Sequence, residues 1–413
     1  MLCPCYFLCV PMPLPASLPV PEPVRAIAQR LDDAGHDVWC VGGAIRDHLL
    51  RQPSSDFDLA TAATPQEVMA LFRRTVPVGV EHGTVAVLDD ANVPHEVTTF
   101  RRDVTTDGRH ATVAFGVSVD EDLARRDFTI NAIAYHPLRA EWRDPFEGGA
   151  DLGRGLLRAV GDPAQRFRED YLRILRLVRF AARFGFAIDP ATWQAAREAA
   201  DGLVHLSAER VRDEWFKGLI SARSAGRLVE LWQEMGALQR WIPGTRYTVH
   251  GAREILDALQ PAGPVVITAW LTDDPVAALR HLRCSNAEVE RGARIARFRG
   301  VIPQPRNRTV VRRWLSRVGE AADDLVVIAE AEGSSAGVRS AVNAARSSGV
   351  PLTLRDLAVT GDDLMAAGVP PGPAVGEMLH QLLDTVLDNP RKNTRETLLG
   401  LVRERGAGSR EPA

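Results

Sequence analysis

The apolar positions of the first 150 residues recur with two periods, one typical of helices and one typical of strands. Val38–Val41 is a short apolar run that suits a buried strand. Thr64, Pro65 and Glu67 have the order of a helix N-cap, a first-turn proline and a capping-box acid. Together these patterns predict strands at residues 38–41, 56–60, 76–80, 84–88 and 96–100, and helices at residues 24–34, 44–50 and 65–73.

From about residue 151 onward only the helical spacing continues. It predicts helices at residues 167–184, 190–202, 207–217, 267–282, 285–298, 308–318, 321–332 and 374–387, with residues 406–413 disordered. At 413 residues the chain is too long for one compact core. The expected fold class is therefore α+β: a head with a mixed β-sheet and flanking helices at residues 22–150, followed by an all-α neck (151–225), body (226–345) and tail (346–413).

The first 21 residues stand apart from this pattern. They are apolar, but they lack a basic start and are interrupted by prolines, so neither a signal peptide nor a membrane helix is expected. We expect a disordered leader, or a mis-assigned start with Met12 as the initiator. The five cysteines, at positions 3, 5, 9, 40 and 284, have the spacing of neither a zinc site nor a disulfide framework, which fits a cytoplasmic protein.

Composition narrows the possible partners. A hydrophobic content of 45% and a charged content of 25% are typical of a soluble globular protein. The net charge is −3, so contact with nucleic acid would need a local basic patch. An aromatic content of 6% argues against a stacking platform for long single strands. No membrane and no protein partner is implied.

The first strand is followed directly by Gly42 and Gly43. Because glycines have no side chains and free φ angles, their backbone N–H groups can approach a phosphate at the start of the next helix. Arg46 adds a positive charge one turn into that helix. A glycine pair alone is typical of a turn, so the residues that follow the helix decide what these glycines do.

Asp56 and Asp58 follow that helix. If residues 56–60 form a strand, its period of two places both carboxylates on one face, about 6–7 Å apart at Cα. At that distance they could share a pair of hard divalent cations. An Asp-x-Asp pair alone is typical of a solvated strand edge, but the glycines and Arg46 ahead of it predict a metal–triphosphate site.

The segments GGAIRD at residues 42–47 and DFDLAT at residues 56–61 resemble the bacterial tRNA CCA-adding enzymes and poly(A) polymerases, the class II nucleotidyltransferases of the polymerase-β-like superfamily. The resemblance implies a nucleotidyltransferase head with two Mg²⁺ ions. It implies metal binding by Asp56 and Asp58, triphosphate binding by Gly42, Gly43 and Arg46, and a third catalytic carboxylate, Glu96. Taken alone, a single glutamate on a strand is usually just solvated.

Residues 125–132, RRDFTINA, also match the family. From spacing alone, Asp127 could N-cap a short helix that carries Asn131, and surface pairing explains Arg126. The resemblance implies instead that Arg126, Asp127 and Asn131 contact the nucleotide sugar. Residues 101–113 are polar and turn-rich and predict a mobile loop, which in the family is linked to the switch from adding C to adding A.

The predicted helix at residues 167–184 carries a basic stripe beside its apolar face. A solvated face with ion pairs would explain this stripe. Residues 169–176, EDYLRILR, resemble the family's base-selecting motif, which implies that role for Glu169, Asp170, Arg173 and Arg176. Cytosine and adenine share an amino donor beside an unprotonated ring nitrogen, which an aspartate acceptor and an arginine donor complement; uracil and guanine invert that pattern. Arg176 is expected to orient Asp170 or to meet phosphate.

Further basic residues are candidates for contact with tRNA, although a solvated face explains them equally well. The candidates are Arg109, Arg179, Arg183, Arg312 and Arg313, together with the backbone at Gly372 ahead of the helix at residues 374–387. Residues 207–217 carry Arg210 with Glu214 and Asp213 with Lys217 at i,i+4 spacing, which predicts a helix with a scaffolding role.

The resemblance runs from about residue 24 to residue 401. It implies template-independent transfer of CMP, CMP and AMP from CTP and ATP to a tRNA 3′ end, with release of pyrophosphate. A poly(A) polymerase shares these motifs, but residues 78–85, VGVEHGTV, look like the CCA-adding form. A partial enzyme that adds only CC or only A is a second hypothesis, which the loop at residues 101–113 disfavours. An inactive tRNA-binding module is a third, which Asp56 and Asp58 disfavour.

Overall fold

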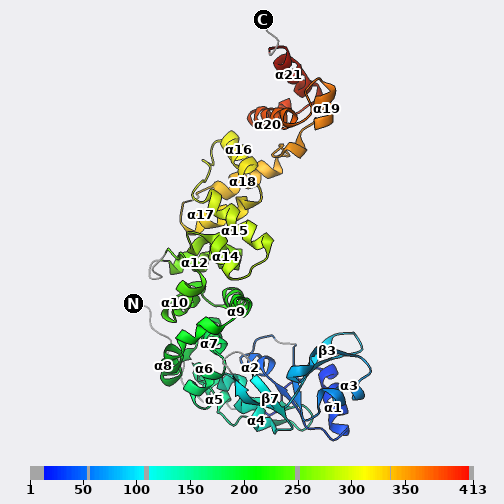
Figure 1. Ribbon diagram of the computed structural model, residues 1–413, viewed down its shortest axis with the longest axis vertical. Helices are drawn as coiled ribbons and strands as arrows, with labels where there is room; N and C mark the ends of the chain where they lie inside the picture. The colour runs from blue at the N-terminus through cyan, green and yellow to red at the C-terminus, as the bar shows by residue number, and fades with distance from the viewer. Residues whose placement is uncertain (1–13, 54–55, 107–110, 247–251, 335, 409–413) are drawn as a thin grey trace. The chain divides into compact units, whose positions relative to one another are not determined.

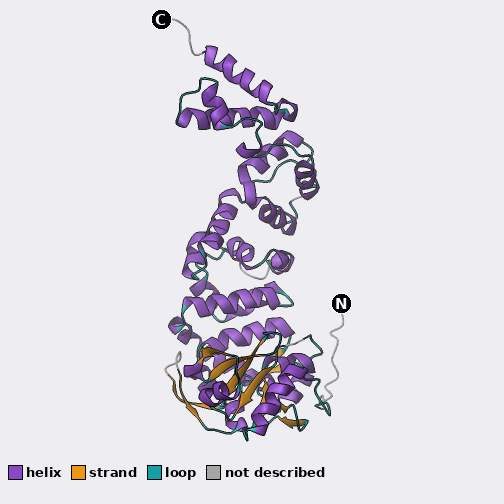
Figure 2. Ribbon diagram, turned by 90° about the vertical axis from the view of Figure 1, so that its right-hand side faces the viewer, coloured by secondary structure: helices purple, strands orange, loops and turns teal. Residues whose placement is uncertain are grey.

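The computed structural model describes residues 14–53, 56–106, 111–246, 252–334 and 336–408 of the 413-residue chain. The chain divides into two compact units: unit 1, Met1–Ile242 with His281–Arg283, and unit 2, Pro243–Arg280 with Cys284–Ala413. In the described part of the chain all named strands belong to unit 1, and unit 2 is helical (Figure 2). This confirms the α+β class. Within the described residues no helix is both long and apolar enough to cross a membrane.

A seven-stranded mixed sheet forms the head of unit 1 (Figure 1). Its strand order is β3-β4-β5-β2-β1-β8-β9, and β2 pairs in parallel with β5 but antiparallel to β1. The strands are β1 (Val38–Val41), β2 (Asp58–Thr61), β3 (Thr75–Gly79), β4 (Thr84–Leu88), β5 (Pro94–Thr99), β8 (Ala134–His136) and β9 (Glu141–Arg143). All four residues of β1 are buried, which explains why its sequence is an unbroken apolar run.

Strand β2 is shorter than expected, because it begins at Asp58 and leaves Asp56 ahead of it. Phe57 and Leu59 are nevertheless both buried, as a period of two requires. The parallel register pairs Leu59 with Val97, so one step earlier it brings Asp58 beside Glu96. The backbone therefore puts two carboxylates on neighbouring strands.

Short helices flank the sheet. They are α1 (Glu22–Asp33), α2 (Gly43–Leu49), α3 (Pro65–Leu71), η1 (Val80–His82), α4 (Val119–Ala124), η2 (Thr129–Asn131) and α5 (Gly148–Arg154). The capping box of α3 is confirmed, with Thr64 and Glu67 bonding each other's backbone N–H. Asp144 accepts from the N–H groups of Gly148 and Gly149 at the start of α5.

The loop expected at residues 101–113 is wrong for the described part of that segment. Strands β6 (Arg101–Thr106) and β7 (Ala111–Phe115) pair antiparallel as a two-stranded sheet, and residues 107–110 lie outside the described residues. Valine and threonine recur in both strands and favour extended backbone. The charged residues in the same segment made it look polar and turn-rich, so the strands were not predicted.

The helices after the head are α6 (Pro163–Glu169), α7 (Leu172–Phe184), α8 (Pro190–Glu198), η3 (Ala200–His205), α9 (Ala208–Ser221), α10 (Ala225–Glu234) and α11 (Ala237–Trp241), and β10 (Leu156–Leu157) pairs with β11 (Ala187–Ile188). The single helix expected at residues 167–184 is wrong. Asp170 has φ −153° and ψ 107°, which ends α6 and separates it from α7. The helix expected at residues 190–202 ends at Glu198 and is followed by η3.

The chain from residue 253 onward forms α12 (Arg253–Leu259), η5 (Gln260–Ala262), α13 (Pro264–Leu271), α14 (Pro275–His281), α15 (Asn286–Phe298), α16 (Arg308–Val318), η6 (Gly319–Ala321), α17 (Ala322–Ala331), α18 (Val338–Ser347), η7 (Leu354–Asp356), α19 (Gly361–Ala366), α20 (Pro373–Asp388), η8 (Pro390–Lys392) and α21 (Arg395–Gly408). The helix expected at residues 267–282 is two helices, because Pro275 starts a new one. Helix α21 reaches Gly408, so the disorder expected from residue 406 is wrong for residues 406–408.

The leader expected to be disordered packs against the head in its described part. Leu18 and Val20 are buried, and the Trp142 indole N–H donates to the carbonyl of Pro15 at 2.7 Å. The expectation is therefore wrong for residues 14–20, whereas residues 1–13 lie outside the described residues.

Candidate functional site

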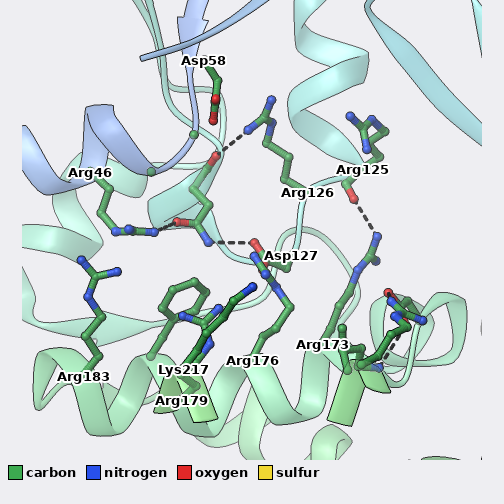
Figure 3. A pocket seen from close by; sticks show the side chains of 17 residues that line it. Arg46, Asp58, Arg125, Arg126, Asp127, Arg173, Arg176, Arg179, Arg183 and Lys217 are labelled. Atoms are coloured by element: carbon green, nitrogen blue, oxygen red, sulfur yellow. Dashed lines mark hydrogen bonds and ion pairs between the residues drawn. The ribbon is translucent and has the colours of Figure 1, made fainter. Parts of the chain in front are cut away.

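A cavity of about 590 Å³ lies in unit 1 and is lined by residues of α2, β2, α7, α9 and the segment around η2. Eight arginines and one lysine line it, against three aspartates (Figure 3). Such an excess of positive charge favours a polyanionic ligand. The cavity brings together four segments that the sequence singled out, represented by Gly42, Asp58, Asp127 and Asp170.

At Gly42 the backbone passes close to two side chains that line the cavity. Its φ of +81° favours glycine, and a Cβ there would lie 3.3 Å from Oδ2 of Asp58 and 3.6 Å from Nη1 of Arg126. Gly43 begins α2, and a Cβ on it would lie 3.4 Å from the Arg46 guanidinium. A side chain at either position would occupy space in the part of the cavity that lies next to the N-terminus of α2.

The three predicted catalytic carboxylates interact electrostatically. Burial, together with the negative charges of Glu96 and Asp56, raises the pKa of Asp58 to about 6, and the positive charge of Arg126 opposes this rise. Asp58 lines the cavity, whereas Asp56 and Glu96 are exposed. Among the residues that the structure describes, no three His, Cys, Asp or Glu side chains are close enough together to form a metal-binding group.

Arg46 is buried, with 4% of its surface exposed. Its guanidinium donates to Asp47 at 2.8 Å and to Oδ1 of Asn131 at 2.5 Å, and it lies over the rings of Phe180 and Phe184. Arg46 therefore ties α2 to both η2 and α7. The sequence predicted Arg46 only as a positive charge beside a phosphate, and it did not predict these contacts between elements.

Asp127 is a buried residue of the cavity lining, and it connects its own segment to η2 and α7. Its Oδ1 accepts from the Phe128 N–H and the Asn131 amide, both at 2.8 Å, and its Oδ2 accepts from Nε of Arg176 at 2.7 Å. Burial alone would raise the pKa of Asp127, but the charge of Arg176 and these hydrogen bonds outweigh it and lower the pKa to about 2. Asp127 is not the N-cap of η2, which is Phe128, so that expectation is wrong.

Asp170 and Arg173, two residues of the predicted base-selecting motif, both line the cavity. Nη1 of Arg173 donates to Glu169 at 2.7 Å and to the carbonyl of Arg166 at 3.1 Å, and its Nη2 donates to the carbonyl of Arg125 at 2.9 Å. These contacts join the motif at residues 169–176 to the motif at residues 125–132. Glu169 itself does not line the cavity and acts as a partner of Arg173.

Arg176 does not bond Asp170, which was one of its two expected roles. Its Nε donates to Asp127, and its Nη1 is 3.8 Å from Glu214 on α9. Arg179 donates to the same buried Glu214. The i,i+4 pair expected between Arg210 and Glu214 is therefore wrong, because Glu214 reaches across to α7.

Helix α9 contributes two residues to the cavity, Arg210 and Lys217, which the sequence pattern indicated only as parts of a scaffolding helix. Arg210 donates to Oδ2 of Asp170 at 2.7 Å. Every arginine of the cavity forms an ion pair, whereas Lys217 forms none with any described carboxylate. The i,i+4,i+7 spacing of Arg210, Glu214 and Lys217 places all three on one helix face, and that stripe was the available signal.

The candidate tRNA-binding residues are dispersed. Arg179 and Arg183 line the cavity, where Arg183 bonds Asp47 at 3.0 Å. In unit 2, Arg312 and Arg313 lie on α16, Arg313 is paired with Asp384 and Asp388, and Gly372 is the N-cap of α20. Arg109 lies outside the described residues.

Three family models match separate parts of the chain. The "Poly A polymerase head domain" matches residues 38–158, the "Probable RNA and SrmB- binding site of polymerase A" matches residues 185–248, and "tRNA nucleotidyltransferase domain 2" matches residues 271–402. The first of these matches contains both carboxylate strands, β2 and β5, and the RRD segment of the cavity.

Relatives that match over most of the chain include CCA-adding enzymes of several bacteria. A CCA-adding enzyme of Limosilactobacillus fermentum is 36% identical over 389 residues, which cover 92% of this chain and 95% of the relative. One of Geobacillus stearothermophilus is 35% identical over 390 residues, covering 92% and 96%. The crystal structure of the Bacillus stearothermophilus CCA-adding enzyme in complex with CTP has a TM-score of 0.78 and 33% identity, covering 95% of this chain and 99% of the other.

Proposed function

Because the chain belongs to the CCA-adding enzyme family, we propose that it completes tRNA 3′ ends by adding CMP, CMP and AMP from CTP and ATP. The observation that carries this proposal is a single cationic cavity that contains both Asp58 and the pair Asp170 and Arg173. The part around Asp58 suits phosphoryl transfer, and the part around Asp170 and Arg173 suits the recognition of a base. In each round the terminal 3′-hydroxyl of the tRNA attacks the α-phosphate, and pyrophosphate leaves.

Nucleotidyltransferases of this family generally use divalent metal ions. The residues here fit such ions, because Asp56, Asp58 and Glu96 offer hard oxygen ligands. Burial and then the negative charges of Glu96 and Asp56 raise the pKa of Asp58, and a cation would relieve the repulsion between these charges. We assign two Mg²⁺ ions to Asp56 and Asp58, with Glu96 as the third catalytic carboxylate. When bound, Mg²⁺ lowers the pKa of an attacking hydroxyl and neutralises charge on the leaving oxygens.

The protein side chains bind and orient the nucleotide. Gly42 and Gly43 leave room for the triphosphate at the start of α2, with Arg46 behind them. Asp127 and Asn131 present carboxylate and amide groups suited to ribose hydroxyls, and Arg126 lies beside them. Asp170 and Arg173 accept from and donate to the Watson–Crick edge of cytosine or adenine, and Arg176 acts through Asp127.

Contacts with tRNA are proposed for the basic residues named above and for Gly372 at the start of α20. The division into head, neck, body and tail at residues 150, 225 and 345 also stays a proposal. We place the enzyme in the cytoplasm, where its tRNA substrate is processed. In the described part of the chain, Cys40 and Cys284 are free thiols, which suits a reducing compartment.

The test is extension of a tRNA that lacks its CCA end. Purified protein receives CTP alone, ATP alone or both, and the 3′ ends are sequenced. We expect addition to stop after CC with CTP alone and to finish as CCA with both nucleotides. Long A-tails would make the protein a poly(A) polymerase, and arrest after CC with both nucleotides would make it a partial enzyme.

Lys217 gives a prediction about triphosphate binding. Because its charge is unpaired among the described residues, Lys217→Gln should raise the KM for CTP and for ATP about tenfold, the size expected for one charge-assisted hydrogen bond. Steady-state kinetics measure this effect, with ATP on a CC-ended tRNA and with CTP on a tRNA that lacks its CCA end. Lys217→Arg should keep most of the affinity, and an unchanged KM in the glutamine variant would place the triphosphate elsewhere in the cavity.

A further inference from the structure

Asp170 lies at a break between two helices. Its backbone, at φ −153° and ψ 107°, belongs to neither α6 nor α7. A residue inside a helix has its side-chain direction set by the backbone and the packed turns around it. Asp170 lacks that constraint, so its carboxylate must be oriented by other contacts.

Two hydrogen bonds orient it. Oδ1 accepts from the Leu172 N–H at 3.0 Å, which is a contact within its own segment. Oδ2 accepts from Nη2 of Arg210 at 2.7 Å, and Arg210 belongs to α9, 40 residues away. Within the described residues, Arg210 is the one side chain of another helix that bonds Asp170.

Arg173 is held differently. Its guanidinium is bonded to Glu169, to the carbonyl of Arg166 and to the carbonyl of Arg125, and its backbone lies inside α7. Arg176, expected to orient Asp170, bonds Asp127 instead. Of the two base-reading side chains, Asp170 therefore depends on one distant partner and Arg173 does not.

We propose that Arg210 is a positioning residue for base choice, which acts by holding Asp170 in the direction that accepts the amino group of cytosine or adenine. With one lone pair of each carboxylate oxygen already used, the remaining acceptor positions have fixed directions. Without Arg210, the carboxylate can rotate away from that direction, and it then discriminates less against uracil and guanine, which present a carbonyl in place of the amino group. This inference rests on the proposed function.

The test compares kcat/KM for CTP and UTP on a tRNA lacking CCA, using wild type, Arg210→Ala and Arg210→Lys. The CTP preference should fall about tenfold in Arg210→Ala, as for one charge-assisted hydrogen bond lost, and partly recover in Arg210→Lys. The matched control is Arg212→Ala, two residues along the same helix. Arg212 bonds Asp213 and the carbonyl of Arg283, and does not line the cavity, so its removal should leave the preference unchanged.

A double-mutant cycle separates positioning from scaffolding. If Arg210 acts through Asp170, then adding Arg210→Ala to Asp170→Ala should change the CTP preference by less than about twofold. A scaffolding ion pair would lower the kcat/KM of CTP and UTP equally and leave their ratio unchanged, which would overturn the inference. Failure of wild type to extend the tRNA at all would instead refute the proposed function.

Discussion

Replacement of Asp56 and Asp58 with alanine is expected to abolish nucleotidyl transfer, lowering kcat by at least about a thousandfold. Metal ions supply several kcal/mol of stabilisation to the transition state, and each 1.36 kcal/mol corresponds to about a factor of ten in rate. Single-turnover extension of a CC-ended tRNA with ATP measures the loss. Because Asp58 lies beside Glu96 and Asp56 and already has a raised pKa, its removal should not lower the thermal unfolding midpoint.

The matched control is Asp90→Ala. Asp90 lies in the same domain, is fully exposed, and pairs only with the exposed side chain of Arg74 among described residues. It should keep wild-type activity. Extension that survives the double replacement at residues 56 and 58 would mean that the metal site lies elsewhere, whereas a large fall in the unfolding midpoint would mean that activity was lost through misfolding.

Much of the head could be predicted because its signals are local. The capping box of Thr64 and Glu67 lies within one turn of helix, and an apolar run such as Val38–Val41 has few other uses than a buried strand. The alternation around Asp58 is equally local, and Phe57 and Leu59 are buried as predicted even though β2 begins two residues late. The motifs singled out by resemblance contribute Gly42, Asp58, Asp127 and Asp170 to the lining of one cavity.

What could not be predicted depends on contacts between distant residues. The partners of Arg176, Arg179 and Arg210 lie 35 to 49 positions away. For Arg210 the sequence suggested a partner one turn along the same helix, for Arg176 it suggested Asp170 or phosphate, and for Arg179 it suggested tRNA. The break at Asp170 was hidden because residues 167–184 keep their helical spacing on both sides of it. Local spacing shows which residues share a face but not which helix that face meets.

Asp127→Asn is expected to lower both stability and activity, because Asp127 is the buried acceptor that joins Arg176, Asn131 and the Phe128 N–H. The pKa of Asp127 in the folded protein is about 2, against an ordinary value of 3.8. A difference of nearly two units corresponds to roughly 2 kcal/mol of unfolding free energy at neutral pH. Asparagine would also leave Glu214, whose carboxylate is 3.8 Å from the Arg176 guanidinium, as the remaining ion-pair partner of Arg176 among the described residues. The rate of extension should therefore fall at least about tenfold.

The pH dependence of this loss gives the sharper test. A carboxylate whose pKa is depressed in the folded state stabilises it fully above the unfolded pKa, near 3.8, and this contribution is lost as the pH falls through about 2. The stability difference between wild type and Asp127→Asn, from urea denaturation, should therefore be constant from about pH 8 to 5 and shrink below about pH 4. Asp201→Asn, a change at an exposed carboxylate on η3, should show little difference at any pH. A stability difference that grows as the pH falls would mean that Asp127 is protonated in the folded protein, and the ion pair with Arg176 would then not hold η2 against α7.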